Sequence, residues 1–104
     1  MTAPLRGQVY LAYIGYGPKP WLIVSNNPRN RATADVLAVR LTTTVRELPT
    51  WVRLGPTDPL KGYVNADNIE TLGKTELGEY LGSLSPESMM NVNRALAVAL
   101  GLPA

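Results

Sequence analysis

The residues most suggestive of chemistry lie in segment 17–27, which reads Gly-Pro-Lys-Pro-Trp-Leu-Ile-Val-Ser-Asn-Asn. Pro18 and Pro20 fix their φ angles and lack amide donors, so we expect them to hold Lys19 on a stiff turn outside any sheet ladder. The apolar run 21–24 then predicts a buried strand. A cation on a stiff turn beside a core strand is suited to holding an anion, such as a phosphate, in one place.

The chain contains no cysteine and no histidine. This composition excludes disulfides, thiol chemistry and the usual zinc sites, and it removes the commonest general acid–base. An enzyme built from this chain would work with Lys, Arg, Asp, Glu, Thr, Ser or Tyr. A carboxylate-only metal site is not excluded, but no paired spacing supports one, so we expect neither a metal nor another cofactor.

The composition is that of a single globular domain over residues 1–104, with 45% hydrophobic and 17% charged residues. No apolar run approaches the roughly 20 residues of a membrane span, and no signal peptide is recognisable, so we expect a cytoplasmic protein. Residues 1–61 hold eight Lys or Arg against three Asp or Glu, whereas residues 62–104 hold two against five. This asymmetry favours an anionic partner such as nucleic acid, although an ordinary solvated surface would show it too.

Short strands must position the reactive residues. Alternation and β-branched or aromatic residues predict strands at 8–13, 21–24, 35–44, 50–54, 62–72 (with a bend within 65–68) and 78–84. On strand 35–44, we expect Leu37, Val39 and Leu41 to face one side and Arg40, Thr42 and Thr44 the other. Glycine, proline and polar residues predict a turn at 15–18, an exposed loop at 25–33 and a loop at 55–59, and residues 74–77 a helical turn.

One helix closes the chain. Ser85 is its expected N-cap, Pro86 its first residue and Gly101 its stop. Its expected buried stripe is Met89, Val92, Leu96, Ala99 and Leu100. Since a parallel α/β fold would need crossover helices, we predict a mainly β (α+β) domain, a small curled antiparallel sheet or barrel with a C-terminal helix.

Five segments, in order along nearly the whole chain, resemble the MazF/PemK/Kid toxin endoribonucleases. They are 6–10 (Arg-Gly-Gln-Val-Tyr), 19–25 (Lys-Pro-Trp-Leu-Ile-Val-Ser), 41–42 (Leu-Thr), 67–71 (Asp-Asn-Ile-Glu-Thr) and 82–87 (Gly-Ser-Leu-Ser-Pro-Glu) with the helix that follows. The resemblance implies an SH3-like barrel of the MazF/CcdB type and a symmetric homodimer. It also implies metal-independent, sequence-specific cleavage of single-stranded RNA to 2′,3′-cyclic phosphate and 5′-OH ends, neutralised by a cognate antitoxin.

Such cleavage requires deprotonation of the 2′-OH, stabilisation of the phosphorane and protonation of the leaving 5′-oxygen. The resemblance assigns these tasks to Lys19, Thr42 and Asp67, without saying which residue is the base and which the acid. Lys19 departs from the arginine usual at its position, and it binds phosphate as a point charge rather than a planar fork. The structural alternatives are a solvated lysine, an ordinary strand threonine and a turn aspartate bonded to its own backbone.

Other residues are candidates for binding RNA. Arg40 precedes Thr42 by two positions, so both face the same side of the strand, where Arg40 could supply the guanidinium that Lys19 lacks. The polar segment after the Lys19 strand is suited to reading base edges. Tyr16 or Trp21 could stack a base, although Trp21 fits a core position better. Arg46 or Arg53 could extend a basic track. The predicted RNA-binding set is Tyr16, Asn26, Asn27, Arg29, Arg31, Arg40 and Arg46.

Two other functions stay open. A gyrase poison of the CcdB type shares the implied fold, but its activity depends on a tryptophan near the C-terminus, and the tryptophans here are Trp21 and Trp51. A non-catalytic SH3-like module that binds RNA or peptide is the other alternative. The sequence leaves open the cleavage sequence, the class of RNA and the antitoxin, and fold alone does not decide among the functions.

Overall fold

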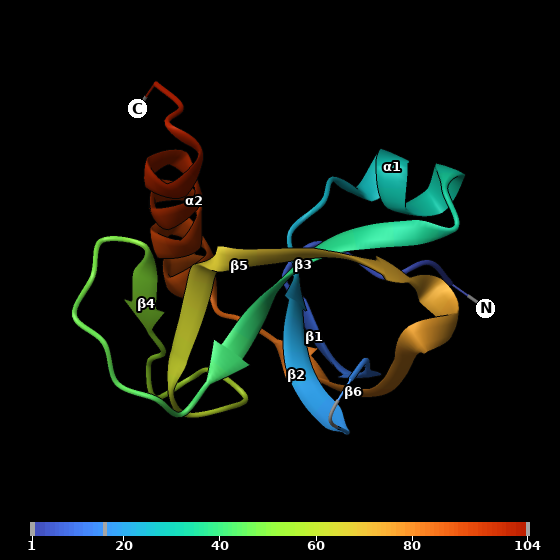
Figure 1. Ribbon diagram of the computed structural model, residues 1–104, viewed down its shortest axis with the longest axis horizontal. Coiled ribbons are helices and arrows are strands. Elements are labelled where there is room, and N and C mark those ends of the chain that lie inside the picture. Colours follow the sequence, from blue (N-terminus) through green and yellow to red (C-terminus); the bar gives the residue numbers. More distant parts are fainter. Residues whose placement is uncertain (1, 16, 104) are drawn as a thin grey trace.

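The computed structural model describes residues 2–15 and 17–103, which form one antiparallel sheet and two α-helices (Figure 1). The elements are β1 (Gln8–Tyr13), β2 (Pro18–Ile23), α1 (Asn27–Ala32), β3 (Asp35–Thr42), β4 (Trp51–Arg53), β5 (Tyr63–Gly73), the 3₁₀ turn η1 (Lys74–Glu76), β6 (Leu77–Ser83) and α2 (Pro86–Leu100). The strand order is β4-β5-β3-β2-β1-β6. The strongly curled sheet with a C-terminal helix confirms the predicted fold class.

The sheet separates two hydrophobic cores. One core lies between the sheet and α2, and the other lies within the curl of the strands. The first contains Val9, Leu22, Val39, Leu41, Val52, Leu54, Val64, Ala66, Leu84, Val92 and Ala95, and the second contains Ala12, Trp21, Ile23, Val36, Ala38 and Leu72. Successive residues of β2 and β3 therefore point alternately into the two cores. The face of β3 expected to be polar carries polar side chains only from Arg40 onward.

Lys19 lies within the sheet, so the prediction that it stands outside any ladder is wrong. Strand β2 begins at Pro18, and Lys19 is the register partner of Ala12 on β1. The two prolines are two positions apart, so their missing donors face the same edge of the strand. Strand β3 pairs with β2 only from Trp21 onward, so that edge needs no amide donor there.

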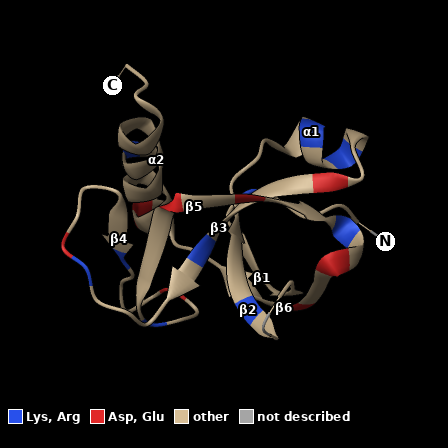
Figure 2. Cartoon of the chain, in the orientation of Figure 1, with Lys and Arg blue, Asp and Glu red and all other residues tan. Residues whose placement is uncertain are grey.

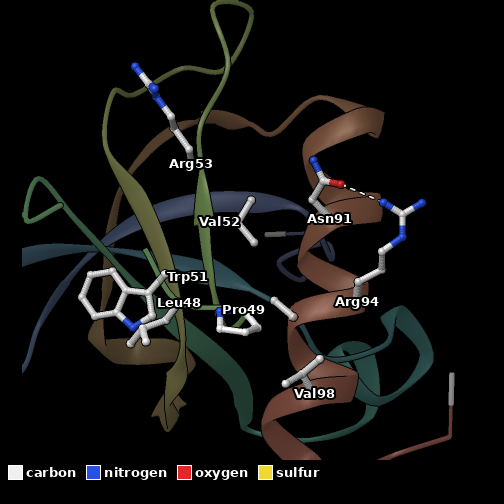
Figure 3. Close-up of a pocket in the computed structure, with 9 residues that line it drawn as sticks. Leu48, Pro49, Trp51, Val52, Arg53, Asn91, Arg94 and Val98 are labelled. Carbon is white, nitrogen blue, oxygen red and sulfur yellow. Dashed lines mark hydrogen bonds between the residues drawn. The ribbon is translucent and has the colours of Figure 1, made fainter. Parts of the chain in front are cut away.

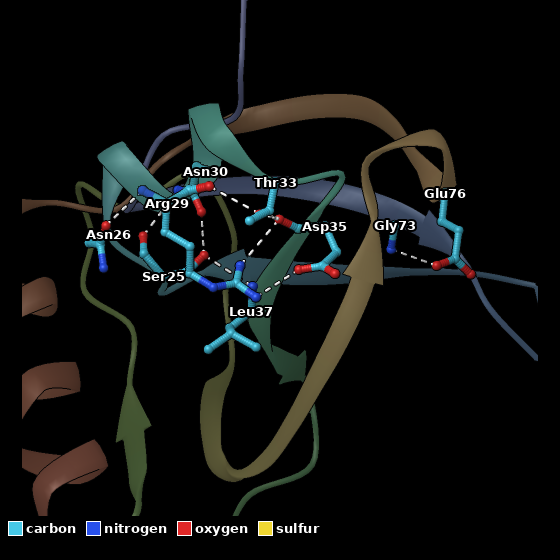
Figure 4. Close-up of polar contacts among 9 residues, drawn as sticks. All are labelled: Ser25, Asn26, Arg29, Asn30, Thr33, Asp35, Leu37, Gly73 and Glu76. Atoms are coloured by element: carbon cyan, nitrogen blue, oxygen red, sulfur yellow. Dashed lines mark hydrogen bonds and ion pairs between the residues drawn. The ribbon is translucent and has the colours of Figure 1, made fainter.

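Segment 25–33 is not the exposed loop that its composition predicted, because it contains α1. Asn26 caps this helix by accepting a 2.8 Å hydrogen bond from the Arg29 amide. Asn30 is fully buried, and its side chain is hydrogen-bonded to the hydroxyl and the carbonyl of Ser25. Arg29 pairs with Asp35 at 2.7 Å, which ties the helix to β3 (Figure 4).

The predicted bend in the fifth strand is confirmed, and it changes the pairing with β3. Val39 faces Ile69, but the next residue, Arg40, faces Asn65, so residues 66–68 form a bulge in β5. Strand β3 ends at Thr42 rather than at residue 44. The Thr44 amide instead donates a 3.1 Å hydrogen bond to the Thr42 hydroxyl, which turns the chain away from the sheet.

Helix α2 has the predicted ends. The Ser85 hydroxyl accepts from the Ser88 amide, and Gly101 closes the helix in the left-handed conformation. The predicted buried stripe is only partly right: Val92 is buried, but Leu100 is 57% exposed because the last turn extends beyond the sheet. In the described part of the chain, no helix combines the length and hydropathy needed to cross a membrane.

Candidate active site

Lys19, Arg40 and Thr42 lie on one face of the β2–β3 pair. Trp21 and Arg40 are register partners across these strands. The pairing of β2 with β3 covers Trp21 to Ile23 on β2, so Lys19 lies two residues before the paired stretch and Thr42 lies two residues after Arg40 on β3. By strand alternation, Arg40 and Thr42 share one face of β3, and Lys19 is on the corresponding face of β2, two residues before the register partner of Arg40.

These three side chains offer positive charge and a free hydroxyl proton. Lys19 is exposed, whereas Arg40 and Thr42 are half-buried. The Arg40 Nε donates to the Leu41 carbonyl at 3.1 Å, so this bond does not use the two terminal nitrogens of the guanidinium. The Thr42 hydroxyl accepts from the Thr44 amide, so its proton can be donated to an anion. An ammonium, a guanidinium and a hydroxyl are groups that bind phosphate oxygens.

Asp67 lies in the β5 bulge, toward β4. Its carboxylate accepts a 2.6 Å hydrogen bond from the Thr50 hydroxyl, and its amide donates to the Asn65 side chain at 2.9 Å. Asn65 is the register partner of Arg40, so Asp67 follows two residues after a neighbour of Arg40; its hydrogen bonds join it to Thr50 and Asn65 and not to Lys19 or Thr42. Among residues 2–15 and 17–103, no three carboxylates gather into a group that could hold a metal ion.

The exposed segment 43–49 leaves β3 and contacts the same face of the sheet further along. The Arg46 guanidinium carbon lies 5.5 Å from the centre of the Trp51 ring, and the Tyr63 hydroxyl donates to Glu47 at 3.1 Å. Burial and the neighbouring Glu47 carboxylate raise the pKa of Tyr63 above 10.0 despite the opposing effect of Arg53. Tyr63 therefore remains a neutral hydrogen-bond donor at physiological pH.

The residues predicted to bind RNA from segment 25–33 lie elsewhere. Helix α1 stands at the opposite end of the β2–β3 pair from Lys19 and Thr42 (Figures 1 and 2). Asn26 and Arg29 are engaged in the helix contacts described above, and Asn27 accepts a 2.7 Å hydrogen bond from the Arg6 amide. The remaining member of that segment, Arg31, is exposed on α1, and Tyr16 lies outside the described residues.

A cavity of about 380 Å³ lies between β4 and α2 (Figure 3). Its lining includes Trp51, Val52 and Arg53 from β4 and Arg94 and Ala95 from α2. Because side chains alternate along β4, Val52 points toward α2 while Trp51 points toward the opposite side. The cavity therefore opens between β4 and α2 and is lined by residues from both faces of the edge strand β4.

Sequence reasoning missed Trp51, Tyr63 and Glu47 as neighbours of the site. Tyr63 is the register partner of Thr42, and Trp51 is the register partner of Asn65. The alternation within each strand indicated which residues share a face of that strand. It did not indicate which strands are adjacent or where the bulge shifts the pairing.

The curled sheet and its cationic face together define a small β-protein able to bind an anion. A family model described as PemK-like, MazF-like toxin of type II toxin–antitoxin system matches residues 5–100. Endoribonuclease MazF4 of Mycobacterium tuberculosis is 73% identical over 103 residues, which cover 99% of this chain and 98% of that protein. The chain therefore belongs to the PemK/MazF toxin family, as the resemblance predicted.

Solved structures agree with this assignment. An endoribonuclease from a mycobacterial species, in complex with its cognate antitoxin, is 72% identical with a TM-score of 0.96, covering 98% of this chain and 99% of that one. A MazE–MazF complex from Deinococcus radiodurans has a TM-score of 0.86 at 23% identity, covering 99% of this chain and 100% of that one. The second likeness shows that the fold is shared at low sequence identity.

Proposed function

We propose that this protein is a sequence-specific, metal-independent endoribonuclease toxin that cuts single-stranded RNA. The observation that carries the proposal is the place of Lys19, Arg40 and Thr42 on matching faces of the neighbouring strands β2 and β3, in a chain of this family. The close relative from M. tuberculosis is named an endoribonuclease, which supports the same activity here. Neither histidine nor cysteine is available to this chain, so the chemistry falls to cations, a hydroxyl and a carboxylate.

In the proposed reaction, the 2′-oxygen forms a bond to the adjacent phosphorus as the bond from phosphorus to the 5′-oxygen breaks. Arg40 and the Thr42 hydroxyl stabilise the charge on the non-bridging oxygens. Lys19 binds the same phosphate and gives a proton to the leaving 5′-oxygen. Asp67 takes the proton of the 2′-OH. The products carry a 2′,3′-cyclic phosphate and a 5′-OH.

The proposal includes the partners of the toxin. The domain 1–104 acts as a homodimer in the cytoplasm, where it inhibits growth until a cognate antitoxin binds it. The close structural relative was solved with its antitoxin, which supports this partner. An acidic, disordered antitoxin segment would complement the net positive charge of residues 1–61.

Incubating the purified protein with long single-stranded RNA in EDTA, and mapping the new ends, tests the activity. We expect discrete cuts with 5′-OH ends, and their loss in Lys19→Ala and Thr42→Ala. Lys74→Ala is the matched control, because Lys74 lies on η1, away from β2 and the end of β3. Intact RNA from folded, dimeric protein would sink the nuclease proposal and would direct attention to gyrase and to simple RNA binding.

A further inference from the structure

A pair of aromatic rings lies on the same face of the sheet as Arg40 and Thr42. Trp51 pairs with Asn65, which pairs in turn with Arg40. Trp51 is therefore two strands away from Arg40, about 10 Å at the usual spacing. Its ring centre lies 6.4 Å from that of Tyr63, with the two planes inclined by 54°. A short piece of single-stranded RNA bound at Thr42 would extend far enough to reach these rings.

The Trp51 indole is accessible to a ligand. Its side chain is half-buried, in contrast to Trp21, which is 3% exposed and belongs to the core. The Arg46 guanidinium carbon lies over the indole, 5.5 Å from the ring centre. A guanidinium plane and a nucleobase bind an indole in similar places, through the same π-face. Arg46 thus occupies the position in which a base would stack.

The segment that carries Arg46 is tied to the sheet by a neutral donor. Glu47 accepts the hydrogen bond of Tyr63, and residues 43–49 are otherwise exposed. This bond holds the segment near Trp51 while leaving the Arg46 side chain on the solvent side. Arg46 can therefore leave the indole without disturbing either hydrophobic core.

From this arrangement we infer that Trp51 forms a nucleobase-stacking subsite, which Arg46 fills until RNA binds. The incoming base replaces the guanidinium on the indole, and the released Arg46 pairs with a backbone phosphate. The inference rests on the proposed function and specifies where a base near the cleaved bond is held. Trp51 binds the RNA and takes no part in the proton transfers.

The test uses an RNA that contains a mapped cut site and carries a 2′-O-methyl group there, so that it cannot be cleaved. Fluorescence anisotropy gives its Kd for the wild type, Trp51→Ala, Trp51→Phe and Trp51→Leu. Trp51→Leu keeps the apolar bulk without the aromatic face, and circular dichroism checks that each variant is folded. Tyr80→Ala is the matched control, because Tyr80 is an exposed aromatic on β6, at the other edge of the sheet.

We expect Trp51→Ala and Trp51→Leu to weaken binding about 10-fold or more. Trp51→Phe should recover most of this loss, and Tyr80→Ala should leave Kd unchanged. In a series of RNAs that each lack one base, one abasic position should weaken binding by the wild type as much as Trp51→Ala weakens binding of the intact RNA. Trp51→Ala should bind that abasic RNA as well as it binds the intact RNA. The inference would be overturned if Trp51→Ala bound the RNA as tightly as the wild type. It would also be overturned if, at every abasic position, the loss from the missing base added to the loss from Trp51→Ala.

The proposed function is judged separately, by whether the wild type cuts the unmodified RNA. If the wild type cuts no RNA, an oligoadenylate is used as the ligand in place of the RNA with the mapped cut site, because stacking tolerates any base sequence. Loss of that binding in Trp51→Ala would support the subsite even without cleavage. Equal binding by the wild type and Trp51→Ala would overturn it.

Discussion

Lys19 is the residue at which this chain departs from the arginine that the family resemblance implies. An ammonium carries the same charge as a guanidinium but lacks its two-pronged geometry. Arg40 is the register partner of Trp21, two residues after Lys19 on β2, and in the proposed reaction it supplies the guanidinium. In the proposed reaction the two side chains divide the tasks: Lys19 binds and protonates, and Arg40 orients the phosphate.

This division of tasks predicts how Lys19 variants behave. Lys19→Ala should lower kcat by about 100-fold or more, because a stabilising charge at the phosphorane is lost. Lys19→Arg should stay within about 10-fold of the wild type, since the charge is kept. Steady-state cleavage of a short RNA with a fluorophore and a quencher would measure both variants. An equal loss in Lys19→Arg and Lys19→Ala would contradict a role based mainly on charge.

Thr42 allows a cleaner substitution. Thr42→Val keeps the shape and the strand preference but removes the hydroxyl, so we expect a fall in kcat of about 100-fold with little change in stability. Thr42→Ser keeps the hydroxyl and should retain most of the activity. Cleavage kinetics and thermal unfolding of both variants would check this. If Thr42→Val cleaves as well as Thr42→Ser, the hydroxyl is not part of the reaction.

At the scale of elements, Gly62 fixes the end of β3. Its φ angle is +122°, and a Cβ at this position would collide with the carbonyl of Thr42. We expect Gly62→Ala to destabilise the protein by roughly 2 kcal/mol and to lower activity further by displacing Thr42. Urea unfolding and cleavage rates would measure the two effects. Gly7→Ala is the control, because Gly7 also has a positive φ but a Cβ there meets only ordinary contacts with Met89.

Asp58 anchors the start of α2 from the loop before β5. It accepts hydrogen bonds from the Ser85 amide at 2.8 Å, from the Gly55 amide at 2.7 Å and from the Ser88 hydroxyl. Partial burial alone would raise the pKa of Asp58, but these hydrogen bonds to Ser85, Ser88 and Gly55 outweigh it, and the pKa lies below 3.8. The charged carboxylate is therefore the form that stabilises the fold.

The lowered pKa predicts a pH dependence of stability. The contribution of Asp58 is fully present above its ordinary pKa of 3.8 and is lost as pH falls through the lower folded-state value. We expect Asp58→Asn to reduce the free energy of unfolding by about 2 kcal/mol at neutral pH, and by progressively less as the medium is acidified below that pKa. Urea unfolding across this pH range would test it. A difference that does not shrink in acid would contradict the assignment to the charged carboxylate.

Alternation and turn residues predicted most of the elements, because strands such as β1 and the caps of α2 depend on local sequence. Helix α1 was missed because Asn26 and Pro28 are typical of loops as well as of helix starts. The catalytic candidates were found through the family resemblance and the alternation of β3. Trp51 could not be placed, since its position depends on pairing across three strands and on the shift at the β5 bulge, which are non-local.

At the scale of the whole molecule, the proposed RNA path follows one face of the sheet and not α1. RNA affinity should fall with salt, and Arg40→Gln and Arg46→Gln should each reduce the slope of log K against log salt by about 0.7. Arg31→Gln should leave the slope unchanged, because Arg31 is on α1 at the other end of the sheet. Titrations at several salt concentrations would measure these slopes. A lower slope for Arg31→Gln would instead extend the RNA path to α1.

The two cores on opposite sides of β2 and β3 have a further consequence, for how this toxin can diverge. The strands that carry Lys19, Arg40 and Thr42 are packed on both faces, so most substitutions in them endanger folding. Trp51 stands on a three-residue edge strand, and residues 43–49 before it are exposed. Mutations there cost little stability. Lineages can therefore vary this margin, and with it the proposed contacts to RNA, while the strands that carry Lys19, Arg40 and Thr42 change little.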